Sequence, residues 1–262
     1  MSRSFETLDY AVRDGIAVLT LDREARHNAV NSVMNRELPM AWQQVEADPD
    51  VRVAIVTGRG TKAFCTGADL GDLPQTDDRL DSIRWTAAQN RVTKPVIAAI
   101  NGMAIGGGLH FPADADIVLA ADHATFFDSH VAVGLVAALE PIAMARRMPI
   151  GAVLKMALTG GRERMTAREM HRLGFVDEVL SADALMDRAF ALAAMIAQNS
   201  PTAVARTKAA IWAAKELPLH QALDNGWRLI QAQNGHPDLA EGIAAFGEKR
   251  APVWAPRGPE DL

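Results

Sequence analysis

Two histidines and one glutamate stand where this sequence could carry out acid–base chemistry. His110 follows the glycine triplet of "NGMAIGGGLH" (101–110), and His130 lies in "FFDSHVAVG". An imidazole, whose ordinary pKa is ~6.5, is mostly neutral at pH 7 and can both donate and accept hydrogen bonds. Glu140 in "GLVAALEPIAMARR" could orient the His130 ring and stabilise the imidazolium that forms when the ring takes a proton. A histidine and a carboxylate paired in this way can activate water.

Two glycine-containing segments could hold negative charge with backbone amides. They are "GRGTKAFCTGADL" (58–70) and "NGMAIGGGLH", and each follows a short continuous apolar run that is typical of a buried parallel strand. Small residues let a ligand approach the main chain, and amides at a helix start point toward developing negative charge. Glycines also permit tight turns and close helix packing, so neither segment alone decides between the two roles. The pair of segments predicts one oxyanion hole.

These segments must be positioned by an α/β core. The runs on either side of Asp14-Gly15 in "ETLDYAVRDGIAVLTLDRE" predict a β-hairpin. "SVMNRELPMAWQQVEADPD" has helical spacing, with Ser32 as its expected cap. "VRVAIVTG", "PVIAAI", "ADIVLA" and "GFVDEVL" predict buried strands that alternate with helices. Glu140, followed by proline, is expected in the first turn of a helix.

The sequence after Ser181 is almost wholly helical in its periodicity. We therefore predict a core over residues 1–198 and a C-terminal helical region and tail over 199–262. The proline-rich end, "APVWAPRGPEDL", is predicted to be a loose or docking tail.

Composition excludes several classes of protein. The 262 residues are 49% hydrophobic and 23% charged, which is typical of a globular chain. The net charge of −5 gives no general attraction to nucleic acid, and no apolar run reaches the ~18 residues that a membrane span requires. One cysteine, Cys65, excludes an intrachain disulfide, and we expect a packed thiol there. The opening residues lack the apolar core of a signal peptide, so a cytoplasmic location is expected.

The sequence resembles the crotonase superfamily, also called the enoyl-CoA hydratase/isomerase family. The resemblance covers most of the chain and rests on six segments: "REARHNAVN", "KAFCTGADL", "KPVIAAINGMAIGGGLH", "ADIVLAADHATF", "LTGGRERMTAREMHRLGFVDEV" and "EGIAAFGEKR". It implies an α/β fold, a spiral of ββα repeats with a C-terminal helical region that mediates trimerisation, often as a dimer of trimers. It also implies an acyl-CoA thioester substrate, with coenzyme A as part of the substrate and no permanently bound cofactor.

The resemblance assigns roles to several residues. Ala68 and Gly107 match the two amide donors that hold the thioester oxygen, where charge collects when an enolate forms. Arg26 and Ala29 lie in the loop that follows the coenzyme A nucleotide, and Lys249 matches a lysine that reaches the nucleotide of a neighbouring subunit. The remaining candidates for the coenzyme A and substrate site are Lys62, Asp69 and Leu70. We expect Asp69 to cap the next helix rather than to act in catalysis, and we treat Asp69 and Asp128, which precedes His130, as supporting acids near the site.

The sequence departs from the family at the catalytic positions. Hydratases of this family use two glutamates, and His110 and His130 stand in both places. We expect His130 to act as general base, and His110 to position water or to protonate carbon. A metal site is not expected, since the two histidines lack a third ligand at a characteristic spacing.

Three functions therefore stay open. The first is acyl-CoA hydration or isomerisation with atypical histidines. The second is hydrolysis of a carbon–carbon bond in a β-diketone or 3-oxoacyl-CoA, because a histidine with a carboxylate resembles the β-diketone hydrolases of the superfamily, such as 6-oxocamphor hydrolase. The third is acyl-CoA binding without catalysis.

Overall fold

The chain begins with the predicted antiparallel hairpin. In the computed structural model, which describes residues 4–73 and 83–258, β1 (Leu8–Arg13) pairs with β2 (Ile16–Leu21). Asp14 and Gly15 have φ angles of 51° and 76°, as both central residues of a type I′ turn require. The turn chemistry therefore fixes the register of the first two strands.

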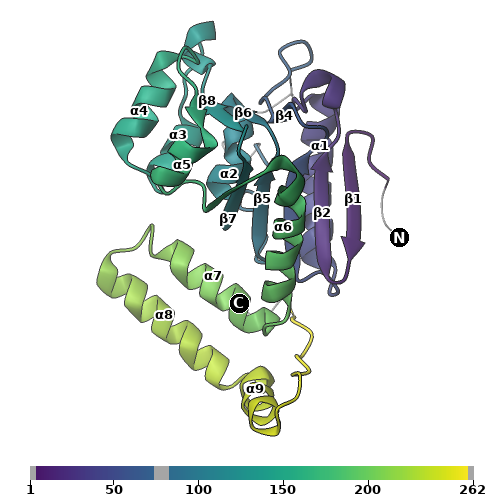
Figure 1. The fold of residues 1–262 in the computed structure, drawn as a ribbon. Coiled ribbons are helices and arrows are strands. Elements are labelled where there is room, and N and C mark those ends of the chain that lie inside the picture. The colour runs from purple at the N-terminus through teal and green to yellow at the C-terminus, as the bar shows by residue number, and fades with distance from the viewer. Residues whose placement is uncertain (1–3, 74–82, 259–262) are drawn as a thin grey trace.

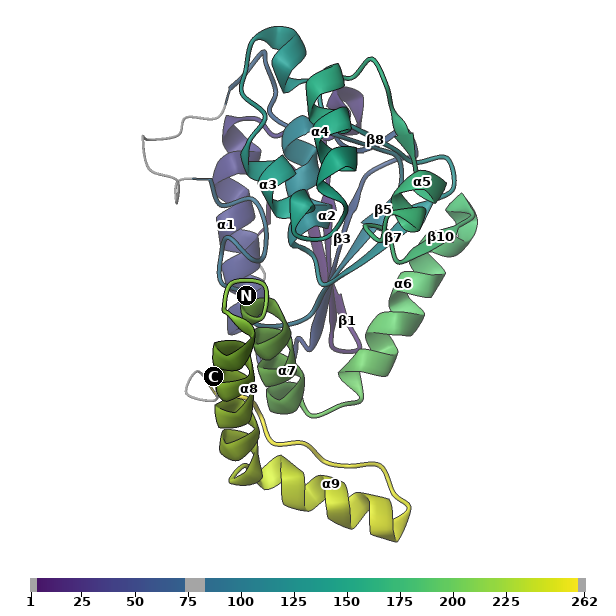
Figure 2. The same cartoon turned by 90° about the vertical axis from the view of Figure 1, so that its left-hand side faces the viewer.

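Parallel strands extend this hairpin into a six-stranded sheet of order β1-β2-β3-β5-β7-β10. The added strands are β3 (Val53–Gly58), β5 (Val96–Ile100), β7 (Ile117–Ala121) and β10 (Glu178–Leu180). Every residue of β3 and β5 is buried, because helices cover both faces of the sheet. Two of these helices, α1 (Ser32–Ala47) and α6 (Ala182–Ala197), lie on opposite faces (Figures 1 and 2).

The chain enters a second, four-stranded sheet after each of three parallel strands. Its order is β4-β6-β8-β9, with β4 (Ala63–Cys65), β6 (Met103–Ile105), β8 (Thr125–Phe127) and β9 (Met165–Thr166). The chain passes from β3 to β4, from β5 to β6 and from β7 to β8, so the same two-strand step recurs three times. This recurrence confirms the predicted spiral.

Helices follow the second-sheet strands and close the spiral. The short helix α2 (His110–Asp114) comes after β6, and α3 (Leu139–Ala145) and α4 (Ile150–Thr159) come after β8. The next helix, α5 (Ala167–Arg172), begins with a capping box between Thr166 and Glu169.

One predicted cap is wrong by a residue. Asn31 caps α1, where its side chain accepts a hydrogen bond from the Met34 amide, and Ser32 is the first helical residue. Asparagine and serine are comparable caps, so the residue types alone could not choose between neighbours.

The C-terminal helices lie beyond the end of the main sheet that is opposite α3 and α4 (Figures 1 and 2). They are α7 (Pro201–Ala213), α8 (Leu219–Asn234) and α9 (Pro237–Glu248). The predicted boundary near residue 198 falls between α6, which packs on the sheet, and α7. The last four residues of the predicted tail, 259–262, lie outside the described residues. Within the described chain, no helix has the length and apolar character to cross a membrane.

Candidate active site

The two glycine-containing segments meet at one point, where β4 ends and the 3-10 helix Gly106–Leu109 begins. A Cβ atom on Gly67 would lie 2.8 Å from the Gly107 nitrogen, so the two backbones are in contact there. A Cβ atom on Gly108 would lie 2.2 Å from the Cys65 carbonyl oxygen. Only glycine permits these approaches. The glycines therefore have a packing role, and that packing brings the two predicted amide donors together.

The Ala68 and Gly107 amides are both left available by the local backbone pattern. Ala68 forms a parallel bridge with Val30, and this bridge is made by the Val30 amide to Gly67 and by the Asp69 amide to Val30. The bridge does not use the amide of Ala68 itself. Gly107 is the second residue of its 3-10 helix, where the first amides have no acceptor within the helix.

The loop before α1 is held against the Ala68 segment by a buried asparagine. Asn28 has a φ of 55°, and its side chain donates to the carbonyl oxygens of Arg59 and Ala63 at 3.0 and 2.9 Å. Its side-chain oxygen accepts from the Arg23 amide at 3.0 Å. Ala29 follows and is also buried. The predicted nucleotide loop therefore lies beside β4.

Asp69 joins this loop to the Ala68 segment, and the prediction that it caps a helix is not met among the described residues. Its carboxylate lies 3.0 Å from Arg23 Nη1 and 3.5 Å from Arg26 Nη2, and it accepts the Gly71 amide. Burial raises the pKa of Asp69, but the Gly71 amide and the two guanidinium groups outweigh burial and hold the pKa below its usual range. Asp69 is therefore an anion that positions Arg26.

His130 forms a dyad with Asp128 at the end of β8. Nδ1 of His130 lies 3.0 and 3.1 Å from the two carboxylate oxygens of Asp128, whose side chain is only 1% exposed. Because a carboxylate only accepts, Nδ1 carries the proton and Nε2 is free to act as a base. The hydrogen bond that His130 donates to Asp128 raises the pKa of His130, although burial lowers it; the charges of Asp128 and Glu140 raise it further.

The His130 ring stands directly over the glycine triplet. A Cβ atom on Gly106, whose φ is +49°, would lie 3.2 Å from Cε1 of His130. Gly106 immediately precedes Gly107, so the dyad and the predicted oxyanion hole share one site. About a quarter of the His130 side chain, 23%, is exposed, which leaves the ring accessible to a ligand.

Glu140 contacts His110. The prediction that Glu140 orients His130 is therefore wrong, because the carboxylate lies beside the other histidine. Nε2 of His110 lies 3.3 Å from Oε1 of Glu140, and both side chains are buried. His110 is the first residue of α2, and Glu140 lies in the first turn of α3, as expected for it. The physical reason is that α2 packs against α3, whereas the adjacent Asp128 already occupies Nδ1 of His130.

Trp85 packs against both Gly107 and His110. Its ring meets His110 edge to face, with centroids 6.1 Å apart, and a Cβ atom on Gly107 would lie 2.7 Å from Cζ3 of the indole. The Trp85 indole donates to Asn35 at 2.6 Å, and its carbonyl accepts from Trp42 at 2.7 Å. Trp85 is therefore held both at its indole and at its backbone.

A further, partly buried acid shares the helix of His110. Asp114 ends α2 and accepts a 2.6 Å hydrogen bond from Thr86. Burial raises the pKa of Asp114, against the Thr86 hydrogen bond and the positive charge of its neighbours. Neither Trp85 nor Asp114 lies in a recognisable pattern, so the sequence analysis assigned no role to either. Asp128 could have been predicted as the partner of His130, because it lies only two residues before it.

The remaining candidate site residues do not lie where the Ala68 segment, the glycine triplet and the two histidines meet. Lys62 and Leu70 are exposed, and each is close in sequence to the Ala68 segment. Lys249 ends α9 in a left-handed conformation, and α9 lies at the far end of the molecule from α3 and α4 (Figure 2). Cys65 is a buried thiol whose pKa burial raises to about 12, so it is packed as predicted. Within the described ranges, no three histidine, cysteine or carboxylate side chains are arranged to hold a metal.

Comparisons with known proteins agree with this architecture. The family model for enoyl-CoA hydratase/isomerase matches residues 11–257. The chain is 35% identical over 249 residues to (E)-benzylidenesuccinyl-CoA hydratase of Thauera aromatica, covering 93% of this chain and 96% of that protein. It is 34% identical over 266 residues to carnitinyl-CoA dehydratase of Proteus mirabilis, covering 96% of this chain and 99% of that protein.

Solved structures show the same fold. An enoyl-CoA hydratase/isomerase from Mycobacterium paratuberculosis superposes with a TM-score of 0.91 at 36% identity, over 97% of this chain and all of that one. An enoyl-CoA hydratase from Mycobacterium tuberculosis gives a TM-score of 0.87 at 31% identity, over 96% and 99% of the two chains. The chain belongs to the enoyl-CoA hydratase/isomerase family, the crotonase superfamily.

Proposed function

We propose that this protein adds water to, or removes water from, the carbon–carbon bond next to an acyl-CoA thioester. The observation that carries the proposal is the convergence of the Ala68 and Gly107 amides with His130 on one side of the glycine triplet. Negative charge on the thioester oxygen would lie between the two amides. The hydratase and dehydratase names of the two relatives, both of coenzyme A esters, support this class of reaction.

In the hydration direction, Nε2 of His130 takes a proton from water as the water oxygen bonds to the β-carbon. The electron pair of the double bond moves through the α-carbon to the thioester oxygen, where Ala68 and Gly107 stabilise the enolate. Asp128 offsets the positive charge that His130 acquires. The His110–Glu140 pair then supplies the proton that the α-carbon takes as the carbonyl re-forms, so that one water is added.

Arg26, Ala29, Lys62, Asp69 and Leu70 form the proposed coenzyme A side of the site. Asp69 keeps the Arg26 guanidinium near the Ala68 segment, while 62% of the Arg26 side chain is exposed and able to meet a phosphate. Lys249 would serve the site of a neighbouring subunit, because α9 projects away from the site of its own chain.

A homotrimer or a dimer of trimers follows from that role of Lys249. It is supported by large apolar side chains that are exposed on the two last helices: Leu219, Leu223, Trp227, Ile230, Ile243 and Phe246. Exposed apolar surface of this extent is typical of subunit interfaces. The single buried thiol suits a reducing cytoplasm.

Carbon–carbon bond hydrolysis is the second candidate, and the His130–Asp128 dyad favours it. A base held by its own carboxylate can direct water at a ketone carbon instead of an alkene carbon. In a β-diketone or 3-oxoacyl-CoA, the bond between that carbonyl and the α-carbon would then break, and the leaving enolate would collect its charge between Ala68 and Gly107.

Product analysis in heavy-oxygen water separates these candidates. The purified protein is incubated separately with enoyl-CoA thioesters, 3-oxoacyl-CoA thioesters and a cyclic β-diketone. The masses of the products are then measured by mass spectrometry. One labelled water added to an enoyl-CoA is the expected result. Two fragments, one a labelled carboxylate, would establish the hydrolase instead. Binding without any product would reduce the protein to an acyl-CoA binder.

Replacing Asp128 by asparagine is expected to move the acidic limb of the pH–rate profile to lower pH. Because Asp128 raises the pKa of His130, the neutral base of the wild type is lost as the pH falls through a pKa above the usual histidine range. Removing the anion lowers that pKa, so the loss of kcat/KM should begin at a lower pH. The measurement is kcat/KM against pH in both proteins.

Asp122→Asn supplies the matched control, because Asp122 lies 3.7 Å from the exposed His123, outside the site. Its profile should match that of the wild type. A lower rate with an unmoved acidic limb in Asp128→Asn would mean that Asp128 only maintains the fold, and the dyad would be dropped from the mechanism.

A further inference from the structure

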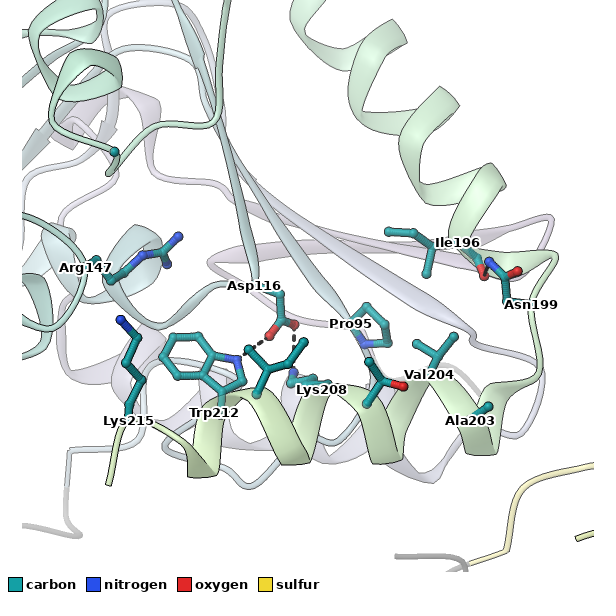
Figure 3. A pocket seen from close by; sticks show the side chains of 13 residues that line it. Pro95, Asp116, Arg147, Ile196, Asn199, Ala203, Val204, Lys208, Trp212 and Lys215 are labelled. Carbon is teal, nitrogen blue, oxygen red and sulfur yellow. Dashed lines mark hydrogen bonds and ion pairs between the residues drawn. The ribbon is translucent and has the colours of Figure 1, made fainter. Parts of the chain in front are cut away.

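A cavity of about 590 Å³ lies at the other end of the sheet from the candidate active site. It is lined by Pro95 and Asp116, which directly precede β5 and β7, whereas the glycine triplet follows β5 and β6. The far wall is one side of α7 (Figure 3). The proposed reaction does not use the residues that line this cavity.

The cavity has an apolar end and a cationic end. Ile196, Ala203 and Val204 lie at one end, and Arg147 and Lys215 lie at the other (Figure 3). The apolar side chains come from the last turn of α6 and the first turn of α7. Asn199 also lies at the end of Ile196 and Ala203 (Figure 3). A volume lined by apolar side chains with a few polar groups is typical of a site for a small organic molecule.

Asp116 does not neutralise the cationic end. Its carboxylate accepts from Trp212 Nε1 at 2.7 Å and pairs with Lys208 Nζ at 2.8 Å, so its oxygens are already engaged near the middle of the cavity (Figure 3). Lys215, which is exposed, donates one hydrogen bond to the Arg146 carbonyl oxygen at 2.7 Å. The cavity therefore keeps more positive than negative charge at the Arg147 end.

Arg147 itself has no carboxylate within ion-pair distance among the described residues. Its Nη1 donates to the carbonyl oxygens of Pro112 at 3.0 Å, Ala113 at 3.3 Å and Ala115 at 2.6 Å, and its guanidinium lies 5.5 Å from the centre of the Phe175 ring. Burial lowers the pKa of Arg147, although the more distant charges of Asp177, Asp116 and Asp114 oppose that effect. An anion at the free side of the guanidinium could form the direct, charge-assisted hydrogen bonds that these carboxylates do not make.

We propose that this cavity binds a small amphipathic carboxylate, with its carboxylate at Arg147 and Lys215 and its hydrocarbon part between Ile196 and Val204. The guanidinium would hold the carboxylate by paired hydrogen bonds, and the apolar end would exclude water from the chain. A neutral ligand of the same shape would not form charge-assisted hydrogen bonds with Arg147 and would bind more weakly.

Calorimetric titration of the assembled protein with octanoate and with octanamide tests the proposal. Octanoate is expected to bind with a Kd below about 1 mM, which suits a ligand of this size, and octanamide at least about fivefold more weakly. Val204→Trp should abolish octanoate binding because the indole fills the apolar end, and Lys215→Gln should weaken it about threefold, as removal of an exposed charge does.

Arg147 anchors α2, so it is not substituted, and thermal unfolding verifies that Val204→Trp folds. Two further controls test for octanoate binding at another site. Octanoate affinity should be unchanged in His130→Ala and in the presence of coenzyme A, because neither touches the cavity. Absence of octanoate binding would overturn the proposal. Equal affinity for octanamide, an unchanged affinity in Val204→Trp, or displacement by coenzyme A would overturn it as well.

Discussion

Turnover should fall by about two to four orders of magnitude when His130 is replaced by alanine, which is the usual contribution of a general base. The reason is geometric: Nδ1 is held by Asp128, Nε2 is free, and the ring lies against Gly106, beside the predicted oxyanion donor. Affinity for the acyl-CoA should survive, because the amides and the nucleotide loop are untouched. The measurement is kcat by steady-state kinetics together with a Kd for a non-reacting thioester.

A histidine on the surface of α8 provides the matched control. His220 is exposed and lies on the helical region far from the site, so His220→Ala should keep the wild-type kcat. If His130→Ala also kept wild-type turnover, His130 would be removed from the mechanism. A weaker Kd with unchanged kcat would assign His130 to substrate binding instead.

His110 should behave differently from His130 because its environment differs. The His110 ring is buried, and it contacts Glu140 and Trp85, whereas the His130 ring is partly open to solvent. The two histidines are therefore not equivalent to each other. This difference supports the proposed division of roles, in which His130 activates water and His110 delivers a proton inside a closed space.

The sequence was informative where local chemistry decides the structure. Asp14-Gly15 predicted the hairpin because both residues accept positive φ, and the apolar run of β3 predicted a strand that is buried along its length. The contact between Gly67 and Gly107 was also foreseeable, since both follow strands whose ends meet at one edge.

The same reasoning failed where partners come from different elements. Glu140 is only ten residues from His130, yet it contacts His110, because packing of α2 on α3 decides the pair and sequence distance does not. The nearer acid, Asp128, reaches His130 within a single turn of chain. Trp85 lies outside every recognised segment, and its contacts with Gly107 and His110 join two separate stretches of chain.

Replacing Gly107 is expected to be nearly as damaging as loss of the base. Gly107 does not have a left-handed backbone, so alanine is permitted by conformation, but its Cβ would lie 2.7 Å from the fixed Trp85 indole. The amide must then shift away from the position of the oxyanion. Loss of one such donor lowers kcat by about 10² to 10³, and Gly107→Pro, which has no N–H, should reach at least that loss.

Two further variants separate a displaced donor from a damaged fold. Gly151→Ala is the matched control, because nothing lies within 4 Å of the added Cβ on α4, and kcat should be unchanged. Trp85→Phe removes the indole atoms that a Cβ at position 107 would meet, so Trp85→Phe/Gly107→Ala should recover part of the kcat lost in Gly107→Ala. Proline has no amide hydrogen to restore, so Trp85→Phe should not rescue Gly107→Pro. Rescue of both, or of neither, would contradict the placement of the Gly107 amide at the oxyanion, because the alanine effect would then not be a displacement by the Trp85 ring.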